Sequence, residues 1–309
     1  MSAWTHPETA GFRGLILLCA WLVATTVSAS QTVLVVGRVS DDPKAHHGRM
    51  QPLVDYVAAR MSDLGIREGR VLMARDAQQM VSYLRQGRVD WITETSATAL
   101  AFQERAGAEP LVRAVRGGFE RYHSVVFVRE DSGIRALGQL RGRVIAFQNP
   151  LSTSAYFVPA AELLGAGLQL AIQASPLERP PSQFIGYAFA QSEANQLTWV
   201  RKGLVDAAAF SDQDWQELVV DNAALAGELS IIHRSGEFPR ALELVRPGLP
   251  AALRERLREL LLSAHADPAA ASALRAYQRT ERFAEIDRET ARVLADLRRG
   301  VRRVRAEIE

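Results

Sequence analysis

The hydrophobic positions form short apolar runs that alternate with stretches of helical periodicity. The run 32–37 is almost entirely apolar, which is typical of a strand buried on both faces of a parallel sheet. Apolar residues then recur at three- and four-residue spacing from Met50 to Leu64, and this predicts one face of an amphipathic helix. More elements follow in the same alternation, with strands expected at 71–73 and 89–93 and helices at 77–86 and 96–106. The order predicts an α/β unit.

A second α/β unit is expected downstream. Its predicted strands are 124–128, 144–147, 184–189 and 205–210, and its predicted helices are 154–164 and 192–202. The runs 229–232 and 241–245 are expected to carry the chain back toward the first unit, and helices are expected at 250–265, 268–278 and 287–308. We therefore expect two lobes, one of residues 30–120 and 230–309 and one of residues 121–229. Two α/β lobes are used both by solute-binding proteins and by enzymes.

The first 29 residues have the pattern of a secretory signal. Arg13 precedes an apolar run at 15–24, small and mostly polar residues follow, and Val27-x-Ala29 fits a cleavage site. Such a run covers about 15 Å as a helix, about half of the hydrocarbon core of a bilayer. We therefore expect residues 1–29 to be a signal peptide and the mature chain to be periplasmic. Retention as an anchor, or lipid attachment at Cys19, stays an alternative.

Composition and charge narrow the function. Of 309 residues, 48% are hydrophobic and 23% are charged, which indicates a globular protein. The chain has 37 basic and 35 acidic residues, so the sequence does not favour nucleic acid as a partner. The one cysteine, Cys19, lies in the predicted signal, which suits an oxidising compartment. No phosphate-binding loop, dinucleotide fingerprint, hydrolase elbow or zinc-protease motif occurs. We expect no catalytic residues, no cofactor and no metal site.

Three consecutive hydroxyl residues stand between a predicted strand and a predicted helix. They are Ser152, Thr153 and Ser154. The first N–H groups of a helix lack partners within the helix, and the helix dipole favours an anion there. Hydroxyls add donors that rotate toward tetrahedral oxygens. The segment therefore predicts a site for a phosphoryl or phosphonyl head, and a plain helix cap with incidental serines is the alternative.

Four blocks of sequence share a recognisable pattern in kind and in order. They are 122–134, 137–142, 152–159 and 203–209. In these blocks the chain resembles a divergent branch of the phosphate, phosphite and phosphonate substrate-binding proteins of ABC importers. The resemblance runs from about Val33 to the C-terminal helix. It implies the two-lobe, type II periplasmic binding protein fold with a central cleft, in which the hydroxyls of 152–154 hold the anion and an ABC permease in the inner membrane receives it.

The chain departs from that family near the predicted site. Where the family has a loop with a ligand-binding tyrosine, this chain has Glu94 and Thr95, and where the family often has a histidine, it has Glu193. A carboxylate would repel a dianionic head. Either these residues recognise the amine of a zwitterionic ligand, or the carboxylates point outward as favourable charges at helix starts.

Aromatic, acidic and histidine residues are the remaining candidates for ligand or metal contacts. Tyr122 and Trp199 are expected as aromatic contacts. Asp212 follows the predicted strand 205–210, at the strand end where ligands of α/β sheets sit, or it caps a helix. His46 and His47 are expected in a loop, where solvation is favoured over metal binding because their spacing matches no zinc pattern.

The predicted function is capture of a small oxyanionic solute by a monomer whose lobes close over the ligand. One alternative is a periplasmic sensor whose closed form contacts a membrane signalling protein. Another is an enzyme on the same fold, which would need reactive histidine or cysteine residues in the cleft.

Overall fold

The computed structural model describes residues 32–40, 42–222, 224–225 and 227–308, together with Met1. The predicted signal peptide, apart from Met1, lies outside the described residues. The chain from Gln31 onward groups into one compact unit. Within the described ranges, no helix is long and apolar enough to cross a membrane.

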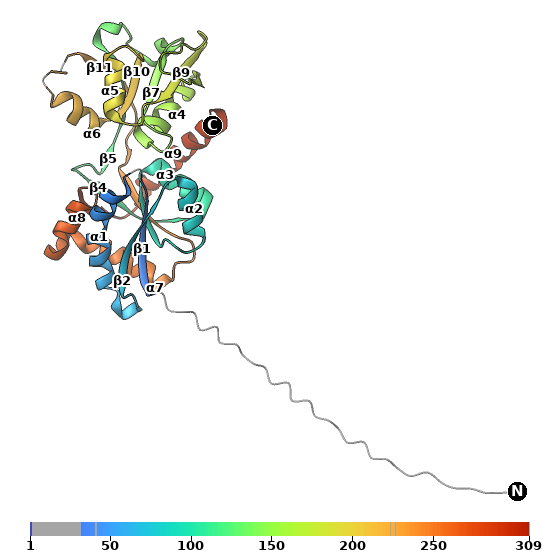
Figure 1. Ribbon diagram of the computed structural model, residues 1–309, viewed down its shortest axis with the longest axis vertical. Helices are drawn as coiled ribbons and strands as arrows, with labels where there is room; N and C mark the ends of the chain where they lie inside the picture. Colours follow the sequence, from blue (N-terminus) through green and yellow to red (C-terminus); the bar gives the residue numbers. More distant parts are fainter. Residues whose placement is uncertain (2–31, 41, 223, 226, 309) are drawn as a thin grey trace. The chain divides into compact units, whose positions relative to one another are not determined.

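Two six-stranded mixed sheets form the framework (Figure 1). The first has the order β14-β4-β13-β3-β1-β2 and the second the order β11-β6-β10-β7-β9-β8. The strands of the first sheet are β1 (Val33–Val39), β2 (Glu68–Ala74), β3 (Trp91–Glu94), β4 (Glu109–Arg116), β13 (Ala241–Val245) and β14 (Thr280–Ala284). The strands of the second sheet are β6 (Ser124–Arg129), β7 (Val144–Phe147), β8 (Gln169–Ile172), β9 (Phe184–Phe189), β10 (Ala207–Ser211) and β11 (Leu229–Arg234). The α/β fold with two lobes is therefore confirmed.

Side-chain caps set where several helices begin. The helices are α1 (Pro43–Ala59), α2 (Ala77–Arg85), α3 (Ser96–Ala106), α4 (Val158–Gly165), α5 (Glu193–Arg201), α6 (Asp212–Trp215), α7 (Ala251–Ser263), α8 (Ala271–Ala276) and α9 (Arg288–Glu307). Asp76 accepts the Gln79 N–H at 2.7 Å, which confirms the predicted cap of α2. Asp42 caps α1 about two turns earlier than the apolar pattern from Met50 predicted. His46 and His47 therefore lie in α1, and their predicted loop position is wrong.

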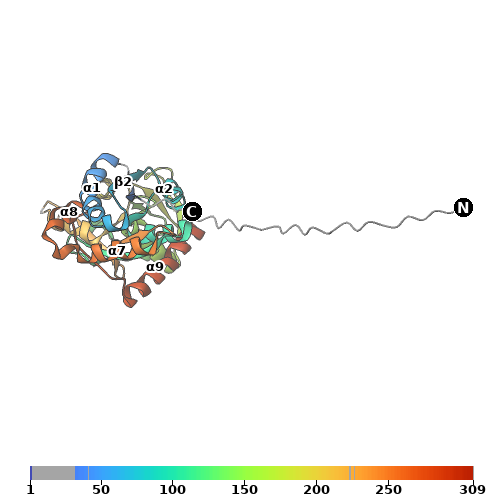
Figure 2. The same cartoon turned by 90° about the horizontal axis from the view of Figure 1, so that it is seen from below.

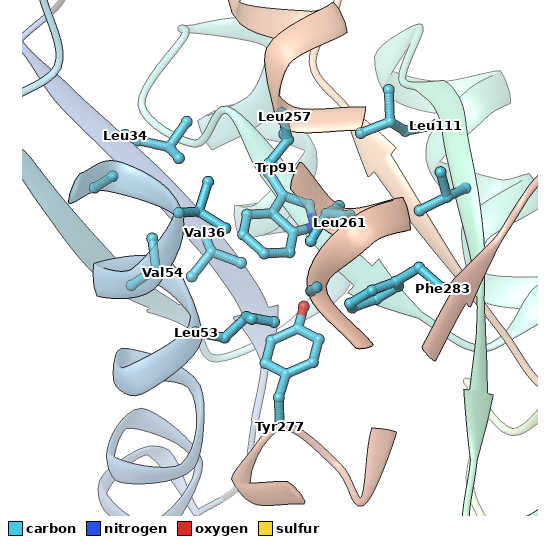
Figure 3. Close-up of a cluster of buried hydrophobic side chains, with 14 of the residues drawn as sticks. Leu34, Val36, Leu53, Val54, Trp91, Leu111, Leu257, Leu261, Tyr277 and Phe283 are labelled. Atoms are coloured by element: carbon cyan, nitrogen blue, oxygen red, sulfur yellow. The ribbon is translucent and has the colours of Figure 1, made fainter. Parts of the chain in front are cut away.

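Each face of the first sheet buries its own apolar cluster. Leu34 and Val36 of β1 point to the face that α1, α7 and α8 cover, and Trp91 lies among them (Figures 2 and 3). On the other face, Met80 of α2 and Phe102 of α3 pack under the sheet. This two-sided burial explains why the strand at 32–37 is apolar at nearly every position.

The chain passes between the sheets along two short paired strands. They are β5 (Arg121–Tyr122) and β12 (Phe238–Pro239), which run antiparallel. The expected return of the chain at residue 230 is wrong, because β11 pairs with β6 at the edge of the second sheet. The helix α9 packs on both α3 and α4, and its Val301 and Val304 join the core of the second sheet. After the two crossings along β5 and β12, the chain therefore reaches the second lobe again through the helix α9.

Beneath the ends of β3 and β13, the fully buried carboxyl of Glu243 accepts hydrogen bonds from four side chains. Its donors are Trp91 Nε1 at 2.6 Å, Thr93 Oγ1 at 2.7 Å, Tyr277 OH at 2.9 Å and Arg116 Nη2 at 3.2 Å. The donors come from β3, from β4 and from the residue after α8, so one carboxyl joins distant parts of the first lobe.

Removing this carboxyl should destabilise the protein strongly. Glu243→Ala strands a buried guanidinium and three other donors, and we expect the free energy of unfolding to fall by about 3–5 kcal/mol. Urea titration followed by circular dichroism measures this change. Glu281→Ala removes an exposed carboxylate of β14 and should stay within about 0.5 kcal/mol of the original protein. Equal free energies of unfolding for the two variants would contradict the predicted contribution of the Glu243 network to stability.

Candidate functional site

A cleft of about 1300 Å³ is lined by elements of both sheets and by the crossing strands. Seven of the predicted site residues belong to its lining: Glu94, Thr95, Tyr122, Ser152, Thr153, Ser154 and Glu193. Pockets for small molecules typically measure about 300–1,000 Å³. The space is therefore larger than one phosphoryl group needs.

The predicted hydroxyl loop, residues 152–154, lines this cleft, and its Thr153 and Ser154 begin a π-helical turn, Thr153–Phe157, that leads into α4. Ser152 is the helix cap, since its Oγ accepts the Ala155 N–H at 3.1 Å. Thr153 Oγ1 accepts the Ala97 N–H at 2.9 Å and donates to Thr95 Oγ1, also at 2.9 Å. The proton of Thr153 is thus committed to the other lobe, so it would have to break this bond before it could donate to an anion.

The same loop is joined to α3 by a further bond. Thr98 Oγ1 donates to the Leu151 carbonyl at 2.7 Å. Together with the bonds of Thr153, this holds the first turn of α3 against the loop before α4. The two lobes therefore meet directly at one wall of the cleft.

Tyr122 occupies the crossing strand β5 and has 2% of its surface exposed. Its ring packs edge-on against Phe238 at 4.5 Å between centroids, and the Arg240 guanidinium lies 4.9 Å from the ring centre. Burial raises the pKa of Tyr122, while Arg240 and a hydrogen bond from Ser154 oppose that rise. Tyr122 thereby connects the crossing strands to the hydroxyl loop.

Seven arginines also belong to the described lining, and the sequence analysis predicted none of them. They are Arg38, Arg49, Arg75, Arg116, Arg240, Arg275 and Arg279. One signal was present for Arg38, which follows an apolar strand directly, at the carboxyl end where α/β sheets bind ligands. Arg116 ends the strand β4, which the pattern did not predict.

Arg116 is buried, with only 5% of its surface exposed. Burial lowers the pKa of Arg116, and the carboxyl of Glu243 opposes that effect. Its Nη2 also donates to Thr93 Oγ1. In the described part of the chain, its Nε has no hydrogen-bond partner, and the same is true of the buried Nε of Arg38. Arg38 and Arg116 both line the cleft, and each therefore has one N–H donor that is not used by the described residues.

Glu94 is the last residue of β3 and lines the cleft. Burial raises its pKa to about 7, against the effects of Arg38, of the Val39 N–H and of Arg116. Its Oε1 is buried without a hydrogen-bond partner among the described residues. Near neutral pH, this carboxyl exchanges between its charged and neutral forms.

Glu193 lines the cleft from the first turn of α5. Its Oε1 accepts a hydrogen bond from Gln148 Nε2. Burial raises the pKa of Glu193, and Asp214 raises it further. Both departures from the family pattern, Glu94 and Glu193, thus face the cleft, and the alternative that they point outward is wrong for this structure.

Two predicted contacts lie elsewhere. Asp212 accepts the His123 N–H at 3.0 Å and pairs with Arg234 at 3.1 Å, so it braces the crossing strands rather than lining the cleft. Trp199 packs on the apolar cluster behind the second sheet. Asp214, two residues beyond Asp212, lines the cleft instead because the turn of α6 rotates it there.

One family model and three solved structures place this geometry among known proteins. A family model described as "ABC transporter, phosphonate, periplasmic substrate-binding protein" matches residues 39–291. The structure of XAC2383 from Xanthomonas citri bound to ATP is 41% identical, with a TM-score of 0.85 over 90% of this chain and 100% of that chain. The same protein bound to chloride ion is 42% identical, with a TM-score of 0.85 over 89% and 99%. PhnD1 from Prochlorococcus marinus, in complex with methylphosphonate, is 16% identical and shares the fold, with a TM-score of 0.62 over 88% and 98%.

The raised pKa of Glu94 predicts a pH dependence of stability. The pKa is about 7 in the fold against an ordinary value of 4.5, so the folded protein binds more protons than the unfolded chain between these values. This contribution is fully present below the lower value and is lost as pH rises through about 7. Glu94→Gln should therefore flatten the fall in the free energy of unfolding across this range.

Urea titrations at several pH values measure that slope. The exposed Glu281→Gln serves as the control and should keep the original slope. Glu193 and Glu243 also have raised pKa values, so part of the slope should persist in Glu94→Gln. A slope that Glu94→Gln leaves unchanged would contradict the raised pKa of Glu94.

Proposed function

The chain belongs to the family of periplasmic substrate-binding proteins of phosphonate ABC transporters, and on this premise we propose that it captures a phosphorus oxyanion in its cleft. As a member of this family it is the solute-binding component of an ABC importer. We propose that an ABC permease in the inner membrane receives the ligand, that residues 1–29 direct export, and that the role is binding without catalysis.

The observation that carries the proposal is a pair of guanidiniums that each have a buried Nε without a partner in the described part of the chain. Arg38 and Arg116 each have a buried Nε without a partner in the described part of the chain, at the cleft that Ser152 also lines. A buried donor without an acceptor costs free energy, and a guanidinium forms its strongest hydrogen bonds with carboxylate or phosphoryl oxygens. An oxyanion bound here would satisfy both donors.

The relatives support an anionic ligand. XAC2383, at 41% identity, has been solved with ATP, and also with chloride. Both are anions, and ATP carries the phosphoryl chemistry that the hydroxyl loop and the arginines suit. The cleft of about 1300 Å³ has room for an organic body beside the phosphoryl head. We therefore propose a phosphoryl or phosphonyl compound that carries an organic substituent.

Capture would use the crossing strands as the hinge. Among the described residues, β5 and β12 form the paired strands between the two sheets, and α9 packs on helices of both lobes. The bonds of Thr153 and Thr98 across the wall of the cleft are the kind of contact that closure would form. In this arrangement, the first lobe supplies the guanidiniums and the second lobe supplies the hydroxyl loop.

One observation favours a zwitterionic ligand as a second candidate. Glu193 and Asp214 line the cleft from the second lobe, and the charge of Asp214 raises the pKa of Glu193. An ammonium group on the ligand would relieve that repulsion. Tighter binding of 2-aminoethylphosphonate than of ethylphosphonate would support this candidate, and equal binding would contradict it.

Ligand binding should stabilise the protein and depend on Arg38. We expect ATP or methylphosphonate, at about 100 times the dissociation constant, to add about 2.7 kcal/mol to the free energy of unfolding of residues 31–309. Arg38→Gln should weaken binding about tenfold or more, because a hydrogen bond to a charged group is lost. Isothermal titration calorimetry measures the affinity.

The matched control is Arg67→Gln. Arg67 is exposed and directly precedes β2, at the opposite end of the sheet from Arg38, since Val33 pairs with Glu68. It should leave affinity unchanged. If an unrelated solute stabilises the protein while ATP, methylphosphonate and phosphate do not, the proposed ligand class is wrong.

A further inference from the structure

Three buried polar atoms that lack partners belong to one group of side chains around Glu94. They are Glu94 Oε1, Arg38 Nε and Arg116 Nε, each without a hydrogen-bond partner in the ranges that the structure describes. The residues end or nearly end strands of one sheet, β3, β1 and β4. All three line the cleft. The site therefore offers two charged donors and one carboxyl oxygen to a single ligand head.

The groups that face Glu94 come from three neighbouring strands. Arg38 on β1 and Arg116 on β4 favour its charged form, and Glu243 on β13 opposes it. Glu243 is itself occupied by four donors, one of which is Arg116. Glu193 and Tyr122 are further titratable groups of the same cleft. Glu94 is thus the carboxyl that has an oxygen to spare beside the two guanidiniums.

The anionic head of a ligand bound among these groups must accept hydrogen bonds from the arginines. It must also lie next to the carboxyl oxygen of Glu94. Two negatively charged oxygens that face one another can both be satisfied when they share one proton. Phosphate monoesters have a second ionisation near neutral pH, with a pKa of about 6, so their oxygens readily hold that proton. Sulfonate oxygens are far weaker bases and share a proton poorly.

We propose that Glu94 shares a single proton with the bound head and thereby selects phosphoryl and phosphonyl compounds over sulfonyl compounds. This inference rests on the proposed function and assigns the specificity of that site. The arginines supply attraction to any oxyanion, while Glu94 makes the attraction conditional on a head basic enough to hold the proton. Such a site takes up a proton with its ligand when both partners start ionised.

Proton uptake on binding tests the proposal in the original protein. Calorimetric titrations of residues 31–309 with ATP and with methylphosphonate, in two buffers of different ionisation enthalpy near pH 8.5, give the number of protons bound. We expect uptake approaching one proton, with the affinity falling by up to about tenfold per pH unit in that range. Glu94→Gln carries its own donor and should bring the uptake near zero.

Selectivity gives the second readout. The original protein should bind methylphosphonate at least about a hundredfold more tightly than methanesulfonate near pH 8.5. In Glu94→Gln that ratio should fall about tenfold or more, because an amide N–H donates equally well to either head. Glu281→Gln removes an exposed carboxylate outside the cleft lining, and it should retain both the proton uptake and the ratio.

The outcomes separate the two proposals. Binding of ATP or methylphosphonate without proton uptake, and with a ratio that Glu94→Gln leaves unchanged, overturns the role of Glu94 and leaves the proposed function standing. Absence of binding by ATP, methylphosphonate and phosphate alike overturns the proposed function and this inference with it. Thermal melts show whether Glu94→Gln is folded, and if it is not, the proton uptake of the original protein decides alone.

Discussion

The buried carboxyl of Glu243 is the constraint on which the first lobe depends. A fully buried acid is tolerated only when its oxygens are satisfied, and here donors from β3, β4 and the end of α8 converge on it. The network does more than join these elements. It fixes the guanidinium of Arg116, a residue of the cleft lining, through Nη2, while the buried Nε has no partner in the described part of the chain. Stability and recognition are thus linked through one residue.

The cleft combines groups that attract an anion with groups that regulate the attraction. Arg38 and Arg116 are the attractive part, and Glu94 and Glu193 are carboxyls whose raised pKa values bring them closer to neutral charge. An acidic residue in an anion site is therefore no contradiction, because desolvation and a shared proton remove its charge. The departures from the family pattern become determinants of specificity under this interpretation.

The hydroxyl loop has a different role from the one its composition first indicated. Ser152 caps the helix. The hydroxyl of Thr153 donates its hydrogen bond to Thr95 of the other lobe, across one wall of the cleft. Only Ser154, which bonds Tyr122, connects the loop to the aromatic and cationic part of the site. Under the proposed function, the loop would contribute to closure as well as to anion binding, and the arginines would supply further contacts to the ligand.

Local pattern in the sequence was enough for much of the fold. The strand 184–189 and the helix 96–106 were predicted with their observed bounds, and both are largely buried segments. Strands with mixed patterns were missed, as β4 was, and β11 was assigned to the wrong sheet. Pairing partners of an edge strand depend on the whole sheet and leave no local signal.

For the site, the sequence by itself determined the hydroxyl loop, Tyr122 and the two unusual carboxyls, since each interrupts or completes a recognisable block. Only the tertiary structure decided that Arg38 and Arg116 lie close enough to Glu94 to affect its pKa, that Thr153 bonds to the other lobe, and that Asp212 lies outside the cleft. These residues are far apart in the chain and come together only because three strands end at the same edge of one sheet. Their burial, which sets the charge of the site, likewise exists only in the folded protein.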